Sequence, residues 1–433
     1  MMRKYLKCQA ILALIMLWTS IGYSQTIKEL MTLHEQNLKD LYATRGAPPS
    51  WVQTGHVDDN YLSWCISHYN KPTAILIYSF TNDTLGLRLF DQNGDKHQTK
   101  IAITKNELTT HVNNVNLLME SSHTNLKPQL RGSKAIRKPK QQLQKSFKLL
   151  NRILLPKAFE LELYEHLIIV PVLNISTLPL AAFTINDKYL IDYMSYSIAP
   201  SLFELMVSDN INKRIEQDEV YYSWTNALLV ANPSYPRDSI WDFPDLPGTL
   251  TEIQSVKSLM EPENFTLLSG KDATKTNVTA SICDFDLLYF ATHGISNAEN
   301  PMENSFLVLA EDQSKGAFLS LKEIMNWRYK CSLKADLVVL SACNTGLGQS
   351  HEGGIIGLAR SFQIAGANHV VMSLWSIDDK ETSKLMSLFF AELKEAKTLM
   401  PHEALRSAIL NYKENVNDHP KYWAAFSIFG VPY

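Results

Sequence analysis

The stretch "DLVVLSACNTG" at residues 336–346 runs from an apolar, β-branched segment into a cysteine and then into Asn-Thr-Gly. A short apolar run without polar alternation is typical of a strand that is buried on both faces. The Asn-Thr-Gly that follows is typical of a turn. Cys343 therefore stands where the chain leaves a strand, and functional groups gather at the carboxyl ends of the strands in parallel sheets.

Four other short runs are also continuously apolar, and helical patterns separate them. The runs are residues 166–172, 227–233, 286–294 and 369–376. Alternating strands and helices predict an α/β fold, with a parallel-rich sheet flanked by helices. Further upstream, "TAILIYSF" and "TLGLRLFD" flank "TND", which predicts a β-hairpin in a β-rich, antiparallel N-terminal subdomain.

A second predicted strand ends in a histidine that could act together with Cys343. "DLLYFATHG" ends at His293-Gly294, and a helical pattern at 320–327 connects it to the cysteine strand, so the two strands can be neighbours. A thiol with the ordinary pKa of about 8.5 is mostly protonated at neutral pH, and an adjacent imidazole favours the thiolate. Cys343 would attack a carbonyl, and His293 would protonate the leaving amine. We expect the backbone N–H groups of Gly294 and Cys343 to have no strand partner and to stabilise the oxyanion.

The net charge of the chain and one basic stretch bear on whether it binds nucleic acid. The formal charge of −3 argues against a nucleic-acid binder. Residues 121–159 nevertheless carry ten Lys and Arg residues and no Asp or Glu. This stretch is interpreted as a solvated loop leading into an amphipathic helix, in preference to a nucleic-acid patch or a protease-sensitive linker. No zinc-ligand spacing is present, so neither a metal nor another cofactor is predicted.

The first residues have the pattern of a signal peptide, predicted over residues 1–24 and followed by a helical segment over residues 25–60. Lys and Arg come first, an apolar stretch at 8–19 follows, and small residues stand at the cleavage positions. The alternative is a membrane anchor, but the apolar run is shorter than the ~20 residues that span a bilayer. The sequence therefore predicts a secreted or periplasmic protein with no stable membrane insertion once the signal is removed.

Four cysteines remain after the predicted signal peptide: Cys65, Cys283, Cys331 and Cys343. An exported chain can form disulfides, but a chain of this size does not need them for stability. Free, mostly buried thiols are the favoured interpretation, and any pairing is left open.

Longer motifs resemble a known family. They are "FATHG", "ADLVVLSACNTGLG", "EGGIIGLARSFQIAGANHVVMSLWSIDD" and "HPKYWAAFSIFG", with weaker matches upstream such as "ALLVANPSY" and "DLPGTLTEIQSV". Together they resemble the CHAT domain, a bacterial caspase-like domain often found with tetratricopeptide repeats. The resemblance implies a caspase-like fold, with the N-terminal part of the domain, β-hairpins and basic linker at 61–160 and the catalytic part at 161–433. It also implies a Cys–His endopeptidase with His293 and Cys343 as the dyad.

Residues beside the strand ends are candidates for substrate binding. These are Ser341, Trp375, Asp378 and Asp379. The acidic pair is well placed to cap the next helix. The functional alternative is that Asp379 lines a pocket for a basic side chain, as acidic groups do in some caspase-like peptidases. The leading hypothesis is an endopeptidase that acts on proteins or peptides, with a preference for a basic residue before the scissile bond. The alternative is a catalytically idle caspase-like scaffold that binds a partner, and a regulatory protein partner fits either.

Overall fold

The computed structural model describes most of the chain after residue 58. The described ranges are 27–30, 59–67, 71–120, 129–130, 140–200, 226–237, 240–260, 264–297, 301–341, 343–344, 352–395 and 400–431, with the single residues 32, 69, 202 and 205. The chain divides into two units, Met1–Asp59 and Asn60–Tyr433. All the strands named below belong to the second unit, and the predicted signal peptide lies outside the described residues.

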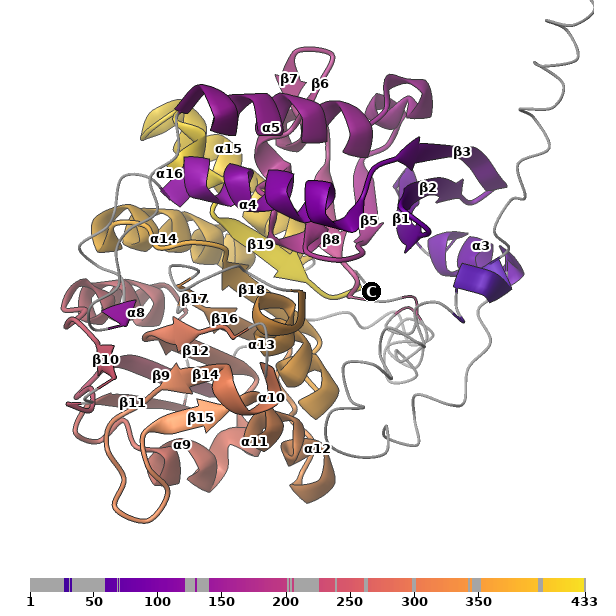
Figure 1. Ribbon diagram of the computed structural model, residues 1–433. Coiled ribbons are helices and arrows are strands. Elements are labelled where there is room, and N and C mark those ends of the chain that lie inside the picture. The colour runs from indigo at the N-terminus through magenta and orange to yellow at the C-terminus, as the bar shows by residue number, and fades with distance from the viewer. Residues whose placement is uncertain are drawn as a thin grey trace, which may run out of the picture. The chain divides into compact units, whose positions relative to one another are not determined.

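An eleven-stranded sheet forms the centre of the second unit (Figure 1). In spatial order its strands are β11 (Asn264–Gly270), β9 (Asn226–Pro233), β12 (Leu287–Ala291), β16 (Leu337–Leu340), β18 (His369–Ser373), β19 (Phe426–Phe429), β8 (Ser195–Ile198), β5 (His166–Val170), β1 (Thr73–Thr81), β2 (Thr84–Asp91) and β3 (Gly94–Ala102). The first five are mutually parallel, and β19 runs antiparallel to β18. The strands β19, β8, β5 and β1 form a second parallel group that runs in the opposite direction.

The predicted α/β class is confirmed, and each of the five apolar runs contains a strand of this sheet. The predicted hairpin is also present, because β1 pairs antiparallel with β2 across Asn82 and Asp83. Both turn residues have positive φ angles, a conformation that Asn and Asp tolerate better than most residues. The hairpin extends the central sheet, since β1 also pairs in parallel with β5.

Helices cover both faces of the sheet (Figure 1). The helices that the structure describes are α3 (Asp59–Ser67), α4 (Lys105–Glu120), α5 (Lys140–Leu154), α6 (Leu190–Tyr193), α8 (Gly248–Met260), α9 (Lys275–Ser281), α10 (Pro301–Asn304), α11 (Leu321–Met325), α12 (Trp327–Lys330), α13 (Glu352–Ala365), α14 (Asp379–Glu395), α15 (Pro401–Asn415) and α16 (Pro420–Trp423). Side chains alternate between the faces of a strand, and β12 shows this directly. The Tyr289 ring lies 6.0 Å from Phe390 of α14, whereas the Phe290 ring lies 5.5 Å from Phe362 of α13.

Smaller sheets lie beyond the ends of the central strands. One has the order β15 (Phe318–Ser320), β14 (Phe306–Val308), β13 (Gly294–Ile295) and β17 (Cys343–Asn344). A second consists of β10 (Trp241–Asp242) and β4 (Gln129–Leu130), and a third of β6 (Thr184–Ile185) and β7 (Lys188–Tyr189). The first of these sheets is the one that positions the candidate site, because β13 follows β12 and β17 follows β16.

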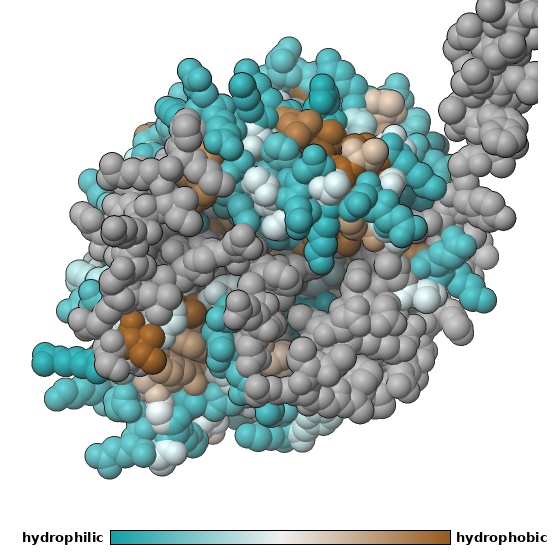
Figure 2. Space-filling view, in the orientation of Figure 1, coloured by the Kyte–Doolittle hydropathy of each residue, from teal (hydrophilic) through white to brown (hydrophobic). Residues whose placement is uncertain are grey.

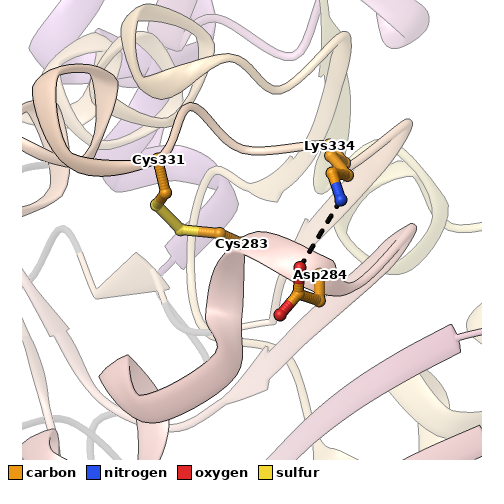
Figure 3. Close-up of a disulfide and its surroundings, with 4 residues drawn as sticks. All are labelled: Cys283, Asp284, Cys331 and Lys334. Carbon is orange, nitrogen blue, oxygen red and sulfur yellow. Dashed lines mark hydrogen bonds and ion pairs between the residues drawn. A yellow bond between two sulfur atoms is a disulfide. The ribbon is translucent and has the colours of Figure 1, made fainter.

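A disulfide joins Cys283 to Cys331, with Cα atoms 6.1 Å apart (Figure 3). The expectation of free thiols is therefore wrong for this pair, while the side chains of Cys65 and Cys343 lie outside the described part of the structure. Cys283 precedes β12 and Cys331 precedes β16, so the bridge ties together the amino ends of these two parallel strands. An exposed ion pair between Asp284 and Lys334 lies beside it, and pairs of this kind contribute little to stability.

The face of the molecule shown in Figure 2 is largely polar over its described part. Figure 2 shows hydrophilic residues over most of the described part of this face, with apolar residues in small groups. Single exposed apolar residues of this kind are ordinary in folded proteins. Among the described helices, none combines the length and the hydropathy that crossing a bilayer requires.

Candidate functional site

The main chain brings the two sequence motifs together just beyond the central sheet. After β12 and β16 end, β13 pairs in parallel with β17, so Gly294 lies opposite Cys343 and Ile295 opposite Asn344. Neighbouring strands lie about 4.8 Å apart. The residue that follows His293 is therefore a direct main-chain neighbour of Cys343. The Cys343 side chain lies outside the described part of the structure, so its distance from the imidazole stays a prediction.

The His293 side chain is buried and held in one orientation. Its Nε2 lies 2.7 Å from the carbonyl oxygen of Pro244, and a carbonyl only accepts, so Nε2 carries the proton and donates. In the neutral ring Nδ1 is then the basic nitrogen. The main chain is fixed as well, because the Val308 N–H donates to the His293 carbonyl at 2.8 Å.

Burial lowers the pKa of His293 to about 4, and the hydrogen bond to Pro244 and the charge of Asp245 offset part of that effect. The imidazole is therefore neutral at neutral pH, which is the form that accepts a proton. Two aromatic rings cover it, since the Tyr235 and Phe243 ring centroids lie 4.7 and 5.7 Å from its own. Both belong to the connection between β9 and α8.

A small cavity of about 50 Å³ adjoins this histidine, with room for a few water molecules. Its lining comes from the ends of several strands and the starts of two helices. The lining residues are Leu246, Thr249, Glu252, Thr292, His293, Ser341, Ser373, Trp375, Ser376, Ile377, Asp379, Thr382 and Phe426. Three of the four predicted substrate-binding residues are among them. Trp375 is one of these and is fixed by its Nε1–H, which donates to the Lys421 carbonyl at 2.9 Å.

The two neighbouring aspartates have different surroundings. Asp378 is exposed and caps α14, because its Oδ1 accepts from the Lys380 N–H at 3.0 Å. Asp378 is not among the residues that line the cavity, and its predicted role in substrate binding stays a prediction. Asp379 does line the cavity, and its Oδ2 accepts from the N–H of Gly248 at 3.1 Å, at the first residue of α8.

Gly248 is required by this contact, because a Cβ at that position would overlap the Cβ and Oδ2 atoms of Asp379. Burial raises the pKa of Asp379, the hydrogen bond from Gly248 acts against that shift, and the charge of Asp378 adds to it. The carboxyl group is therefore held between a helix N-terminus and the cavity.

Glu252 also lines the cavity and was not among the residues predicted from the sequence. Its carboxylate accepts a hydrogen bond from the Tyr289 hydroxyl, and burial raises its pKa to about 7. Hydrogen bonds from Tyr289 and Ser341 offset part of that rise, and the charge of Asp379 adds to it. One signal was available in the sequence, because Glu252 occupies an inward position of α8 together with Thr249, Ile253 and Val256.

Gly294 and Cys343 were expected to lie beyond any strand pairing, and this expectation is wrong. Both residues lie in strands, and Gly294 is flanked on both sides, by Leu307 of β14 and by Cys343 of β17. β17 is an edge strand of the four-stranded sheet. Two-residue strands such as these are too short to be recognised from sequence periodicity.

Among the described residues, no cluster of three or more His, Cys, Asp or Glu side chains is arranged to hold an ion. The cavity presents an imidazole, two carboxyl groups and several hydroxyl groups.

Comparison with known proteins gives two sequence relatives and, separately, a solved structure with a similar fold. Tetratricopeptide repeat protein 28 of Homo sapiens is 25% identical over 276 residues, covering 57% of this chain and 11% of that protein. The Mus musculus protein of the same name is 23% identical over 280 residues, with the same coverage of 57% and 11%. The chain thus spans about a tenth of the length of these relatives.

A solved structure shows the same fold. Separase from Saccharomyces cerevisiae, in its complex with securin, superposes with a TM-score of 0.57 at 12% sequence identity. The match covers 93% of this chain and 33% of the separase chain. At this identity the likeness concerns the fold alone, which is caspase-like. The family model of the CHAT domain matches residues 144–431, so this chain belongs to the CHAT domain family.

Proposed function

We propose that the protein is a cysteine endopeptidase that hydrolyses peptide bonds in protein substrates through Cys343 and His293. The observation that carries this proposal is the parallel pairing of β13 with β17, which sets Gly294 opposite Cys343. Membership of a caspase-like family and a buried, neutral imidazole next to this ladder support it.

The reaction assigned to the dyad is ordinary acyl transfer. His293 Nδ1 takes the thiol proton, and the Cys343 sulfur attacks the carbonyl carbon of the scissile bond. The C–N bond breaks, the amine leaves with the proton from His293, and water hydrolyses the thioester to a carboxylic acid and the free thiol. Cys343 lies on the edge strand β17, so its N–H is a better oxyanion donor than that of Gly294, which lies in an inner strand.

The proposed preference is for a basic residue before the scissile bond. Asp379 and Glu252 both line the cavity beside His293, and the described lining residues include no lysine or arginine. A carboxylate is the usual partner of a guanidinium or ammonium group. Because the cavity holds only about 50 Å³, a basic side chain would enter only after the lining moves, which fits a site that is latent until it is opened.

The proposed location is outside the cytoplasm, secreted or periplasmic. The first 24 residues have the pattern of a signal peptide. The Cys283–Cys331 disulfide supports an oxidising compartment, because such bonds persist there and are rare in the cytosol.

The alternative is a scaffold that binds a protein partner and cleaves nothing. Two observations favour it. The cavity is small, and the human relative is a tetratricopeptide repeat protein of which the match covers only 11%. A regulatory protein partner is compatible with both functions.

The deciding experiment compares the wild type with Cys343→Ala on a mixed library of peptides, after brief mild reduction. We expect cleavage by the wild type alone, and labelling of Cys343 by a thiol-directed probe that slows in His293→Ala. A wild type that cuts no more than Cys343→Ala and labels at the rate of an ordinary thiol would leave only the scaffold.

Specificity has a separate test. Asp379→Asn keeps the size of the side chain and removes its charge. We expect its kcat/KM to fall about 100-fold on peptides with Arg or Lys before the scissile bond, and to change little on neutral peptides. Glu381→Gln, on the same helix but not among the described cavity-lining residues, serves as the matched control. An unchanged preference in Asp379→Asn would remove the basic pocket from the proposal.

A further inference from the structure

A second apolar cluster lies beside the candidate catalytic histidine and is separate from the main core. Its buried members are Ile295, Phe306 and Val308, and four half-buried aromatic side chains pack against them, Tyr235, Trp241, Phe243 and Phe318. Ile240, next to Trp241 in the chain, is 56% exposed. Figure 2 shows apolar residues gathered over this part of the molecule. The five aromatic residues, here called the aromatic cluster, therefore present part of their surface to solvent.

The rings of the aromatic cluster form a continuous path that begins at His293. The Phe243 ring lies 5.7 Å from the imidazole and 6.1 Å from Phe318, whose ring lies 4.4 Å from Phe306. The Trp241 ring lies 6.0 Å from Phe243 and 6.4 Å from Phe306. Rings whose centroids are within about 7 Å of each other are in contact. One apolar surface thus joins the histidine to β10, β14 and β15, which lie together in Figure 1.

The order of the strands puts the aromatic cluster and Asp379 on opposite sides of the proposed dyad. In the four-stranded sheet, β13 lies between β14, which carries Phe306, and β17, which carries Cys343. Asp379 comes after β18, and β18 lies beyond β16 on the Cys343 side of β12. A peptide that crosses the dyad therefore has the carboxyl group of Asp379 on one side and the aromatic cluster on the other.

The proposed reaction assigns each side to a part of the substrate. Cys343 attacks the carbonyl of the residue before the scissile bond, and the basic side chain of that residue is assigned to Asp379. His293 protonates the leaving amine, so the segment after the scissile bond begins at the imidazole. Residues of an extended chain are about 3.4 Å apart, so the first two residues of this segment reach Phe243 and the rings beyond it. The aromatic cluster has no charged side chain, so it favours an apolar side chain there.

We propose that the aromatic cluster is the subsite for the leaving side of the substrate and binds a bulky apolar or aromatic side chain at one of the two positions after the scissile bond. This inference rests on the proposed function and adds a substrate class to it, a basic residue followed by an apolar one. Phe318 is the specificity-determining residue assigned to the subsite. It is half-buried on β15, an edge strand of its sheet, and its ring contacts both Phe243 and Phe306.

The first test uses peptides that differ only after the scissile bond. Each has Arg before the bond and Phe, Leu, Gly or Asp at the first or the second position after it, and competition within one mixture gives the relative kcat/KM. We expect the wild type to have a kcat/KM about 10- to 100-fold higher on the Phe and Leu peptides than on the Gly and Asp peptides, because a large apolar side chain is buried. Cys343→Ala should cut none of them.

Two substitutions of Phe318 and a matched control locate the preference. Phe318→Ala should lower kcat/KM about 10-fold on the Phe peptides and by less on the Gly peptides. Phe318→Lys should raise kcat/KM on the Asp peptides above that on the Phe peptides, a reversal that misfolding does not produce. Phe265→Ala changes a phenylalanine of β11 that is 38% exposed and lies outside the aromatic cluster, so the wild-type preference should remain.

A crosslinking measurement does not depend on turnover. A peptide with Arg followed by the photoreactive residue benzoyl-phenylalanine is irradiated in the presence of Cys343→Ala, and the attachment points are mapped by mass spectrometry. We expect attachment within residues 240–243 or 306–318. Attachment only elsewhere, or no more attachment than a scrambled peptide gives, overturns the inference.

The outcomes separate this inference from the function on which it rests. Cleavage that needs Cys343 but has the same rate whatever follows the scissile bond overturns the subsite and leaves the peptidase standing. An equal loss on all peptides in Phe318→Ala, without a reversal in Phe318→Lys, shows that Phe318 only packs β14 against β15, and this also overturns the subsite. No cleavage of any peptide that depends on Cys343 removes the peptidase, and the leaving-side assignment with it.

Discussion

The two parallel halves of the central sheet each bury a histidine, and the two histidines differ in what holds them. Burial lowers the pKa of both, to about 4 for His293 and about 3 for His166. The Nε2 of His293 donates to a carbonyl, and the ring lines a cavity with Asp379. The Nδ1 and Nε2 of His166 lie 2.9 and 3.3 Å from the hydroxyl oxygens of Ser195 and Ser197.

The difference shows that a perturbed pKa does not by itself identify a catalytic group. A hydroxyl can donate or accept, so the two serines provide a hydrogen-bond partner for each nitrogen of His166. A carbonyl only accepts, so Pro244 fixes the tautomer of His293 and leaves a basic Nδ1. His293 also lines the cavity and directly precedes the pairing of β13 with β17, which includes Cys343. His166 instead packs against His402, with ring centroids 4.1 Å apart.

Replacing each histidine in turn has the largest expected effect. His293→Ala should lower kcat/KM by about 10²–10⁴-fold, because it removes the proposed general base and acid, with a small change in melting temperature. His166→Ala should do the reverse, lowering the free energy of unfolding by about 2–4 kcal/mol and keeping activity at 25 °C within a few-fold. Peptide kinetics and thermal unfolding on both variants measure the contrast. Equal losses of activity would break the distinction between the two halves.

The disulfide is expected to stabilise the half that contains His293. Cys283 and Cys331 are 48 residues apart, and a loop of that length predicts a stabilisation of about 4 kcal/mol in the chain-entropy model. A Cys283→Ser, Cys331→Ser double variant should lose up to that amount in urea unfolding. Hydrogen exchange should quicken in β12 and β16 more than in β1 and β5. A uniform increase over all four strands would contradict a local role for the bridge.

The sequence predicted the parts of the site that depend on neighbouring strands and missed the parts that depend on tertiary contact. Runs such as "LVVL" and "LLYFA" identify buried strands because both of their faces are apolar. The pairing of the His293 and Cys343 strands then follows from a parallel fold. Glu252 was missed because Tyr289 and the other lining residues of the cavity reach it from other elements, and the sequence does not show those contacts.

Two further features, a pair of short strands and a disulfide, could not be predicted from the periodicity of the sequence. The two-residue strands β13 and β17 are too short to leave a pattern, so the pairing of Gly294 with Cys343 was not predicted. The pairing of Cys283 with Cys331 depends on which strand ends are neighbours, and the spacing of four cysteines does not determine it.

Acid is expected to destabilise the protein through the second histidine. The native pKa of His166 is about 3, below its ordinary value of 6.5, so between these values the unfolded chain binds more protons than the native one. Stability is therefore complete above pH 6.5 and is lost as the pH falls below it, by about 2 kcal/mol at pH 5 from this group alone. Ser195, Ser197, Tyr69 and His402 face the ring, and the Lys71 charge lowers its pKa further.

Urea unfolding at pH 7.5 and pH 5 measures this effect, and His166→Gln isolates it from the other buried histidines. The variant should lose about 2 kcal/mol less than the wild type on acidification. His402, whose pKa burial also lowers, contributes to the loss that remains in the variant. An identical pH dependence in wild type and variant would show that His166 is already protonated at pH 5.

The smallest expected effect tests how Asp379 is held. A methyl group at Gly248 would overlap Asp379, so Gly248→Ala should push the carboxyl group out of place or shift the start of α8. We expect kcat/KM on arginine peptides to fall about 10-fold, with a smaller change on neutral peptides, because the charge remains but its position changes. Gln254→Ala, at an exposed position of the same helix, is the matched control. If Gly248→Ala lost activity equally on all peptides, Gly248 would be needed for the packing of α8 against α14 in general, and not for the position of Asp379 in the basic pocket.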